Sequence, residues 1–269
     1  KEYRRQRQMC IRDSYSPGMI FDPSEPTPSP SASDAAAAGA RLREQVLRGW
    51  QPGTDMWLFA YASLIWRPDF DCPEQRPARI RGYHRALKMW SHVNRGTPQC
   101  PGLVFALLPG GSCRGLALRV PADQARQIFE QLWLREMPTL TYIPRWLRCE
   151  TPQGPVQALA FTLPRSSPGY TGLLSPDRYR EVFAQARGCF GTTLEYAHRT
   201  HDSLRALGIE DDALARLLAL TAPADPPLPQ PRRRSHPAQP DRAKPAAQAR
   251  QEDNRPMAHA GAARPESTT

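Results

Sequence analysis

The sequence predicts an α+β protein, in which several strands precede a cluster of helices. Six segments have the length and the strand-favouring side chains of β-strands; they span 56–61, 79–90, 102–108, 114–120, 144–150 and 155–163. Most of the helical patterns come after these segments. This order favours an α+β arrangement over a doubly wound parallel sheet, in which strands and helices alternate.

The first strand is predicted by the apolar run from Met56 to Ala60, which is too short for a typical helix. Glycine and proline separate the later strands. Pro109-Gly110-Gly111 and Gln153-Gly154-Pro155 are both expected to form hairpin turns. The sheet is therefore expected to contain two hairpins, one around each of these turns.

Five helices are expected from cap residues and helical periodicity; they span 35–47, 121–136, 176–188, 192–208 and 211–220. Asp34 is expected to cap the first helix, which would end at Gly49. Ser175 precedes a proline at the first helical position of the third helix. Thr192 and Glu195 have the spacing of a capping box.

Composition divides the 269 residues into three parts. Residues 1–33 are rich in Ser and Pro and are expected to be disordered, and 1–14 resemble a translated sequencing adaptor that is excluded from the fold. Residues 34–220 are expected to form the folded domain. Residues 221–269 are a Pro-, Ala- and Arg-rich segment that is expected to be a disordered tail.

The net charge of +10 is compatible with nucleic-acid binding, but the pattern of charge argues against it. Of the 36 basic residues only Lys1, Lys88 and Lys244 are lysines, as expected for a GC-rich genome. The positive charges are scattered, apart from the triplet 232–234. We therefore expect no nucleic-acid partner. The alternative, binding through the basic tail, would be sensitive to salt.

The chain is expected to be cytoplasmic and free of membrane contacts. No apolar run has the length of a membrane span, and no apolar signal-peptide core follows the basic N-terminus. The six cysteines are widely spaced without a Cys-x-x-Cys pair, which is typical of reduced thiols. His198 and His201 lie three residues apart but have no third ligand nearby in sequence, so no metal site is expected.

Glu136 interrupts the apolar face of a predicted helix. At 100° per residue it falls near the middle of a stripe formed by Ala125, Ile128, Phe129, Leu132 and Trp133. Burial and the helix C-terminus both disfavour a negative charge, which would raise the pKa of this carboxyl toward that of a general base near neutral pH. In the alternative, the helix ends before Glu136 and the carboxylate pairs with Arg135 or Arg145.

The stretch after the first strand carries a second candidate site. The strand turns polar at Ser63, next to the small Ala62. A buried strand that enters a tight turn of small residues can present backbone N–H groups to a carboxylate or an oxyanion. The alternative is an ordinary core strand that ends in an aromatic residue.

Tyr61-Ala62-Ser63-Leu64 resembles the Tyr-Gly-Ser-Leu signature of the gamma-glutamylcyclotransferase superfamily, in its ChaC-like, glutathione-specific branch. Further motifs of that branch follow in the same order, at 81–85, 91–98, 111–115, 132–136 and 168–170. The resemblance covers roughly residues 56–220. Ala62 departs from it, since the signature has glycine there and alanine does not adopt positive φ cheaply.

The resemblance implies a small mixed β-barrel flanked by helices, with a pocket at one end of the barrel. It also implies cleavage of glutathione to 5-oxoproline and cysteinylglycine without a metal or cofactor. The glutamyl amine would attack its own side-chain carbonyl, helped by the high effective molarity of ring closure. Arg135-Glu136 matches the family's Arg-Glu pair, so Glu136 would be the catalytic base and then the acid.

The resemblance also implies substrate-binding residues, which we expect to be Ala60, Tyr61, Ala62, Ser63, Leu64, Ile65, Arg95 and Tyr170. Arg95 would pair with a substrate carboxylate, or else be a surface arginine. Tyr170 would close over the pocket, or else be a half-buried loop aromatic.

We expect a monomer that acts on a small molecule. Two other functions remain open. One is the same reaction on other gamma-glutamyl amino acids or amines. The other is a non-enzymatic regulatory or binding protein, in which Glu136 could be lost without consequence.

Overall fold

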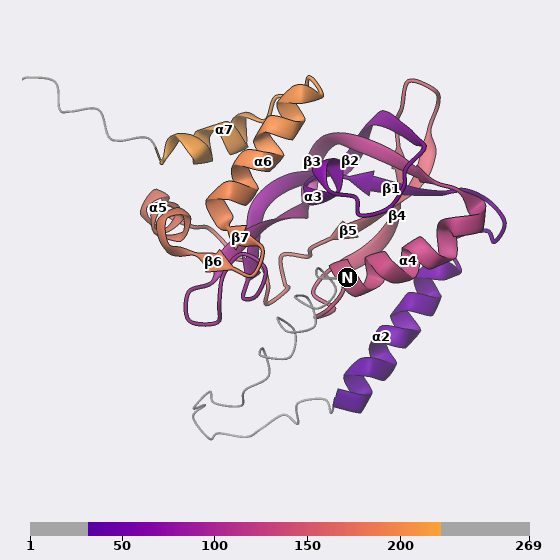
Figure 1. Ribbon diagram of the computed structural model, residues 1–269, viewed down its shortest axis with the longest axis horizontal. Helices are drawn as coiled ribbons and strands as arrows, with labels where there is room; N and C mark the ends of the chain where they lie inside the picture. Colours follow the sequence, from indigo (N-terminus) through magenta and orange to yellow (C-terminus); the bar gives the residue numbers. More distant parts are fainter. Residues whose placement is uncertain (1–31, 222–269) are drawn as a thin grey trace, which may run out of the picture. The chain divides into compact units, whose positions relative to one another are not determined.

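The computed structural model describes residues 32–221 (Figure 1). The adaptor-like residues 1–14 lie outside the described residues, as does nearly all of the segments 1–33 and 221–269 that are predicted to be disordered. Of those two segments the structure describes only Ala32, Ser33 and Thr221, and Ala32 and Ser33 are helical. Those predictions stay predictions.

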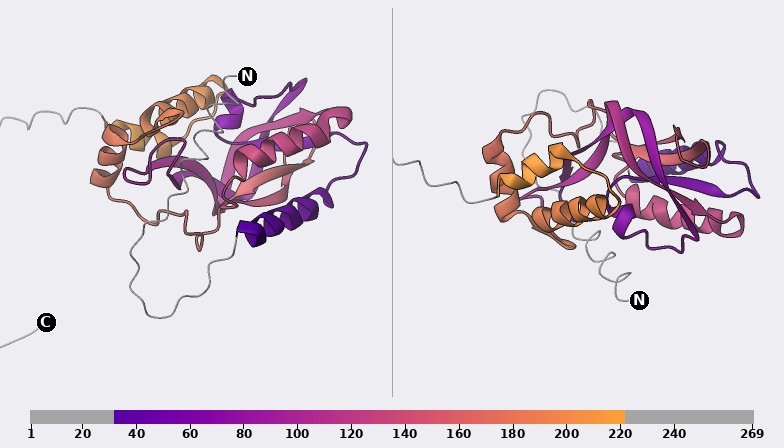
Figure 2. Two further views of the ribbon diagram at one scale, coloured as in Figure 1. Left: turned by 60° about the horizontal axis from the view of Figure 1, so that its bottom comes forward. Right: turned by 90° about the horizontal axis from the view of Figure 1, so that it is seen from above.

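The core is a five-stranded mixed sheet in the order β2-β3-β1-β5-β4. Its strands are β1 (Met56–Ala60), β2 (Glu74–Ser91), β3 (Gly102–Val120), β4 (Ile143–Cys149) and β5 (Val156–Thr162). The central pair β1–β5 is parallel, whereas β1–β3, β2–β3 and β4–β5 are antiparallel. Because β3 pairs with β1 and, at Leu107, also with β5, the sheet curls into a half-barrel (Figure 2). The predicted α+β class and mixed curled sheet are confirmed.

The hairpin predicted at Pro109-Gly110-Gly111 is wrong. Residues 102–108 and 114–120 belong to one strand, β3, which stays paired with β2 on both sides of a register shift between Arg81 and Tyr83. Gly82, Gly110 and Gly111 have φ values of 82°, 101° and 74°. These glycines adopt the positive φ that a bend in a two-stranded ribbon requires. They therefore mark a bend in the ribbon and not the end of a strand.

The second predicted hairpin is confirmed. β4 and β5 pair from Ile143↔Thr162 to Cys149↔Val156. Between them, Gly154 has a φ of 104° and donates its N–H to the carbonyl of Thr151 at 3.1 Å. Here the glycine closes a short turn, as its sequence context predicts.

The helices are α2 (Ala32–Leu47), α3 (Ser63–Trp66), α4 (Ala122–Glu136), α5 (Pro176–Gln185), α6 (Thr193–Ala206) and α7 (Asp212–Ala219). The Ser175 cap and the capping box of Thr192 and Glu195 are confirmed. Asp34 is not a cap, because α2 begins at Ala32 and leaves Asp34 in its first turn. The short α3 replaces the predicted turn.

Helix α5 ends at Gln185 and not near Gly188, because two short strands follow it. β6 (Arg187–Gly188) pairs with β7 (Gly191–Thr192). The chain therefore leaves α5 through a small hairpin before α6 begins.

Two apolar cores lie on the two faces of the sheet, and β1 contributes to both. Leu58 belongs to the core that also contains the apolar stripe of α4. Phe59, the next residue, belongs to the core that contains side chains of α5, α6 and α7. This alternation is the period-two pattern of a strand buried on both faces. Figure 1 accordingly shows α4 apart from the group α5–α7. None of the described helices is long and apolar enough to cross a membrane.

Candidate active site

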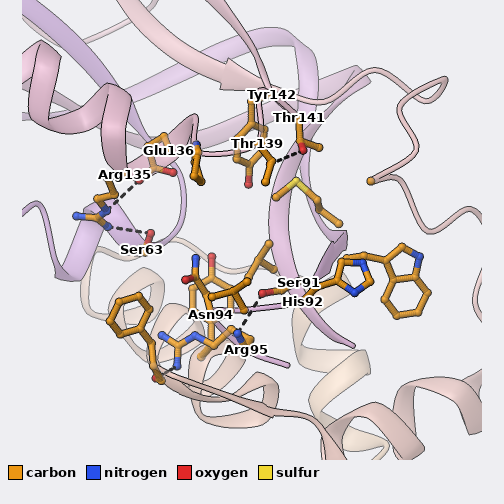
Figure 3. A pocket seen from close by; sticks show the side chains of 18 of the residues that line it. Ser63, Ser91, His92, Asn94, Arg95, Arg135, Glu136, Thr139, Thr141 and Tyr142 are labelled. Carbon is orange, nitrogen blue, oxygen red and sulfur yellow. Dashed lines mark hydrogen bonds and ion pairs between the residues drawn. The ribbon is translucent and has the colours of Figure 1, made fainter. Parts of the chain in front are cut away.

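A cavity of about 470 Å³ opens where the ends of several elements meet. Its wall is formed by Ser63, Trp66, Arg67, 89–95, Val104, Arg135, Glu136, Pro138, Thr139, Thr141, Tyr142, Pro168, Gly169, Phe190 and Tyr196. In Figure 3, Glu136, Arg135 and Ser63 lie together on one side, and Asn94 and Arg95 lie on another. The cavity therefore brings one carboxylate and three guanidinium groups, those of Arg67, Arg95 and Arg135, to one space.

Glu136 is the last residue of α4, and the predicted apolar stripe of this helix is buried. The Glu136 side chain is 17% exposed and points toward the cavity (Figure 3). The alternative in which the helix ends before Glu136 is wrong. The ion pair that this alternative also predicted is confirmed, because Oε1 of Glu136 lies 3.0 Å from Nε of Arg135. The carboxylate is thus both ion-paired and on the cavity wall.

Arg135 connects this carboxylate to the segment around α3. Its Nη1 donates to the carbonyls of Arg67 at 2.7 Å and Pro68 at 3.2 Å, and to Oδ2 of Asp69 at 2.9 Å. Its Nη2 donates to Oγ of Ser63 at 3.2 Å. One guanidinium group therefore holds both the end of α4 and the residues 63–69.

Three buried tyrosines, Tyr61, Tyr142 and Tyr196, lie near enough to Glu136 for its charge to affect their pKa values. Burial raises the pKa of Tyr61 and Tyr142 well above the usual value and that of Tyr196 to about 12, and the nearby Glu136 charge raises each further. All three hydroxyls therefore stay protonated near neutral pH. The hydroxyl of Tyr61 donates to the carbonyl of Phe161 at 3.1 Å, and that of Tyr142 donates to the carbonyl of Phe105 at 2.9 Å.

Arg95 is a buried cation on the cavity wall. It is 7% exposed, and burial lowers the pKa of its guanidinium. Its Nη1 donates to the carbonyl of Phe190, and the guanidinium lies 4.8 Å from the centre of the Tyr196 ring. The alternative of a surface arginine is therefore wrong in position, since Arg95 is buried.

The β6–β7 hairpin holds the loop that carries Arg95. The backbone N–H groups of Cys189 and Phe190 donate to the carbonyls of Val93 and Asn94, each at 3.0 Å. The approach is close at Gly188, where an added Cβ would lie 2.3 Å from the carbonyl oxygen of Val93. This part of the cavity wall is thus built by backbone contact between two distant segments.

Of the predicted substrate-binding residues, the structure places Ser63 and Arg95 on the cavity wall with Glu136. In the described part of the chain, the other six predicted residues are not among those that line the cavity: Ala60, Tyr61, Ala62, Leu64, Ile65 and Tyr170. Tyr170 follows Gly169 of the wall and forms a bridge with Met89. Ala62 has a φ of −145°, so the turn before α3 needs no positive φ.

Sequence reasoning missed three aromatic residues of the wall from separate parts of the chain: Tyr142 before β4, Phe190 in the turn between β6 and β7, and Tyr196 in α6. No spacing in the sequence joins them, because only the folded sheet brings them together. Within residues 32–221, no three His, Cys, Asp or Glu side chains are grouped in a way that could hold a metal ion.

The sequence of residues 56–223 is similar to that of a known family. A model of the family described as ChaC-like protein matches residues 56–223. The chain is 34% identical over 164 residues to the glutathione-specific gamma-glutamylcyclotransferase of Escherichia coli, which covers 61% of this chain and 71% of that protein. It is 30% identical over 174 residues to the human glutathione-specific gamma-glutamylcyclotransferase 1, covering 61% of this chain and 77% of the relative.

A solved structure has the same fold. The crystal structure of a yeast gamma-glutamyl cyclotransferase specific to glutathione superposes with a TM-score of 0.57 at 18% sequence identity. The superposition covers 62% of this chain and 96% of the yeast chain. Residues 56–223, which match the family model, include all five strands of the sheet and all residues of the cavity wall.

Proposed function

The chain belongs to the ChaC-like protein family, and on that premise we propose that it is a glutathione-specific gamma-glutamylcyclotransferase with Glu136 as its acid–base group. Relatives that carry this activity in their names support the reaction. The observation that carries the assignment of the residue is the position of Glu136, a carboxylate that is 17% exposed at a helix end on the cavity wall.

The reaction proceeds within one substrate molecule. Glu136 takes a proton from the α-ammonium group of the glutamyl residue, and the freed nitrogen attacks the side-chain carbonyl carbon. A C–N bond forms, which closes the five-membered ring. The amide C–N bond then breaks as Glu136 returns a proton to the leaving nitrogen of cysteinylglycine. The ring nitrogen loses its second proton, and the released amine takes up one proton to become an ammonium group. The protein needs no nucleophile of its own, because ring closure has a high effective molarity.

The glutamyl end of the substrate binds beside α3 in this proposal. Ser63 is the first residue of α3 and lies on the cavity wall, within reach of the Arg135 guanidinium. Its hydroxyl and the backbone N–H groups of 61–64 would hold the glutamyl carboxylate or the oxyanion of the tetrahedral intermediate. Ala60 and Ile65 flank this segment and would shape it. Ala62 does not hinder this arrangement, since its φ is negative.

Arg95 would bind a carboxylate of the substrate from its buried position on the wall. A desolvated guanidinium forms strong, oriented hydrogen bonds with carboxylates. Tyr170 would close over the cavity from the loop that carries Pro168 and Gly169. We further propose that the enzyme works in the cytoplasm as a monomer, without a nucleic-acid partner. The wide spacing of the six cysteines, without a Cys-x-x-Cys pair, supports a reducing compartment.

The test is to incubate the full chain with reduced glutathione and, separately, with gamma-glutamyl-alanine, and to identify the products by mass spectrometry. We expect 5-oxoproline and cysteinylglycine from glutathione and little turnover of the comparator. Products from the comparator alone would keep the reaction and change the substrate. Absence of product from both substrates would contradict the proposed cyclotransferase activity and favour a non-enzymatic binding protein.

A further inference from the structure

The guanidinium of Arg135 has an unusual share of the contacts at the site. Its side chain is 15% exposed, and its three nitrogens reach acceptors on two separate parts of the chain. Nε faces Glu136 at 3.0 Å, whereas Nη2 donates to Ser63 and Nη1 to Asp69 and two carbonyls. The two parts it joins carry the proposed base and the proposed binding segment for the glutamyl end.

We propose that Arg135 is a positioning residue, which fixes the Glu136 carboxylate and the 63–69 segment in one geometry for ring closure. This inference rests on the proposed function, since it assigns a role within that reaction. The base must reach the substrate amine while the carbonyl to be attacked is held beside Ser63. A rigid connection between the two reduces the motions that would separate them.

Arginine suits this role and lysine does not. The guanidinium is planar and presents five N–H donors in fixed directions, whereas an ammonium group offers three donors at one point. The contacts of Arg135 point in three directions, to α4, to α3 and to the loop at 67–69. A lysine at this position would keep the charge but could not satisfy all of these acceptors together.

Asp69 supports the same geometry from the far side of the guanidinium. Its Oδ2 accepts from Nη1 of Arg135 at 2.9 Å and its Oδ1 accepts from Nε of Arg67 at 3.1 Å. Asp69 has a φ of 61°, a left-handed conformation that Asp and Asn tolerate better than most residues. Asp69→Asn therefore keeps the backbone and removes one charge from this contact.

The electrostatic surroundings of Glu136 set the expected pH effect. From its own helix it faces the cation Arg135. Among the described residues, its charge also acts on the buried hydroxyls of Tyr61, Tyr142 and Tyr196, which stay neutral near pH 7. Arg67 and Asp69 lie beyond Arg135, and Arg95 lines the same cavity. Loss of the Arg135 charge therefore removes a positive charge 3.0 Å from the carboxylate, which favours the ionised base.

The experiment compares kcat, KM and the pH profile of kcat/KM for the full chain and its variants, with reduced glutathione. We expect Arg135→Lys to lower kcat by about 10- to 100-fold with a much smaller change in KM. Arg135→Gln should lower kcat similarly and also move the acid limb of the profile to higher pH, by roughly one unit. Asp69→Asn should lower kcat several-fold. Arg126→Gln is the control, because Arg126 lies on the same helix with a side chain 64% exposed.

Two results would overturn the role of Arg135. One is a folded Arg135→Gln enzyme with the kcat and the acid limb of the wild type. The other is a loss confined to KM, which would make Arg135 a binding residue. If both Arg135 variants fail to fold, Asp69→Asn decides, and an unchanged kcat there overturns the proposal. Failure of the proposed function is distinct, because the wild-type chain would then release no 5-oxoproline.

Discussion

Two arginines hold the same stretch of chain, the residues that connect β1 to the loop after α3, but they do so on different sides of it. Arg85 donates from Nη1 to the carbonyl of Tyr61 at 2.8 Å, and Arg135 donates from Nη1 to the carbonyl of Arg67 at 2.7 Å. Arg135 lies on the cavity wall, whereas the Arg85 side chain is 5% exposed and pairs with Asp211 at 2.9 Å. Similar contacts therefore have different consequences.

The Arg85 contacts serve packing. Its partner Asp211 caps α7 by accepting from the N–H of Leu214 at 3.0 Å, so the ion pair attaches α7 to the sheet. A buried ion pair is weak evidence for net stability, but removal of one partner leaves an uncompensated charge. Arg135, by contrast, is beside the proposed base, and its loss should appear mainly in kcat. The predictions below test this contrast, in order of the expected loss of stability.

Arg85→Met should lower the free energy of unfolding by about 3–5 kcal/mol, because Asp211 remains buried without its partner. Denaturant titration of the full chain measures this. The control is Arg81→Met on the same strand, whose side chain is 71% exposed and whose pair with Glu150 at 3.1 Å should contribute less than about 1 kcal/mol. If Arg85→Met keeps the full free energy of unfolding but has a lower kcat, the claim that Arg85 acts on stability and Arg135 on kcat is wrong.

Gly188→Ala should cost about 1–3 kcal/mol, because the added Cβ would lie 2.3 Å from the carbonyl oxygen of Val93 and 2.5 Å from the backbone nitrogen of Arg95. The displaced loop should also raise KM for glutathione, since it carries Arg95. Thermal unfolding and steady-state kinetics together measure both effects. Gly39→Ala is the control, as its nearest contact would be an ordinary 3.4 Å to Leu140. Equal behaviour of the two variants would contradict this account of the wall.

Thr192→Ala should cost about 1 kcal/mol, because the Thr192 hydroxyl accepts from the N–H of Glu195 at the start of α6. This is the smallest of the three losses, and kcat should remain near that of the wild type. A drop in kcat without a drop in melting temperature would show that the start of α6 acts on the chemistry.

The capping box also gives a pH dependence. The hydrogen bond from the backbone N–H of Thr192 is the main cause that lowers the pKa of Glu195 below its usual value of 4.5. A lowered carboxyl pKa stabilises the fold above the unfolded pKa, and this stabilisation is lost as the pH falls through the folded value. The stability difference between wild type and Glu195→Gln should therefore be present at pH 7 and disappear in acid. Because Glu195 is exposed, the difference should be small.

Local signals predicted the elements well where one segment decides the structure. The apolar stripe of α4, the run of β1 and the caps at Ser175 and Thr192 need only neighbouring residues. The same local reading failed at Pro109-Gly110-Gly111, because positive φ at glycine permits either a turn or a bend, and pairing with β2 selects the bend. The partner strand is far away in sequence, so no local pattern reveals the choice.

The site divides in the same way. The place of Glu136 on the cavity wall could be predicted because a carboxylate interrupts an apolar stripe. The places of Ser63 and Arg95 could be predicted because their motifs resemble those of a family. The contacts of Arg135 with Ser63 and Asp69 span 72 and 66 residues, and no pattern in the sequence relates them. Contacts of this kind depend on the curl of the sheet, which only the folded chain determines.

The most direct test of the central claim is the rate of 5-oxoproline release from glutathione by Glu136→Gln, measured with its melting temperature beside the wild type. This substitution keeps the shape of the side chain and removes the base. We predict a fall in kcat of about 10²- to 10⁴-fold, with folding nearly intact. A folded Glu136→Gln enzyme that releases 5-oxoproline at the wild-type rate would contradict the assignment of Glu136 as the acid–base group.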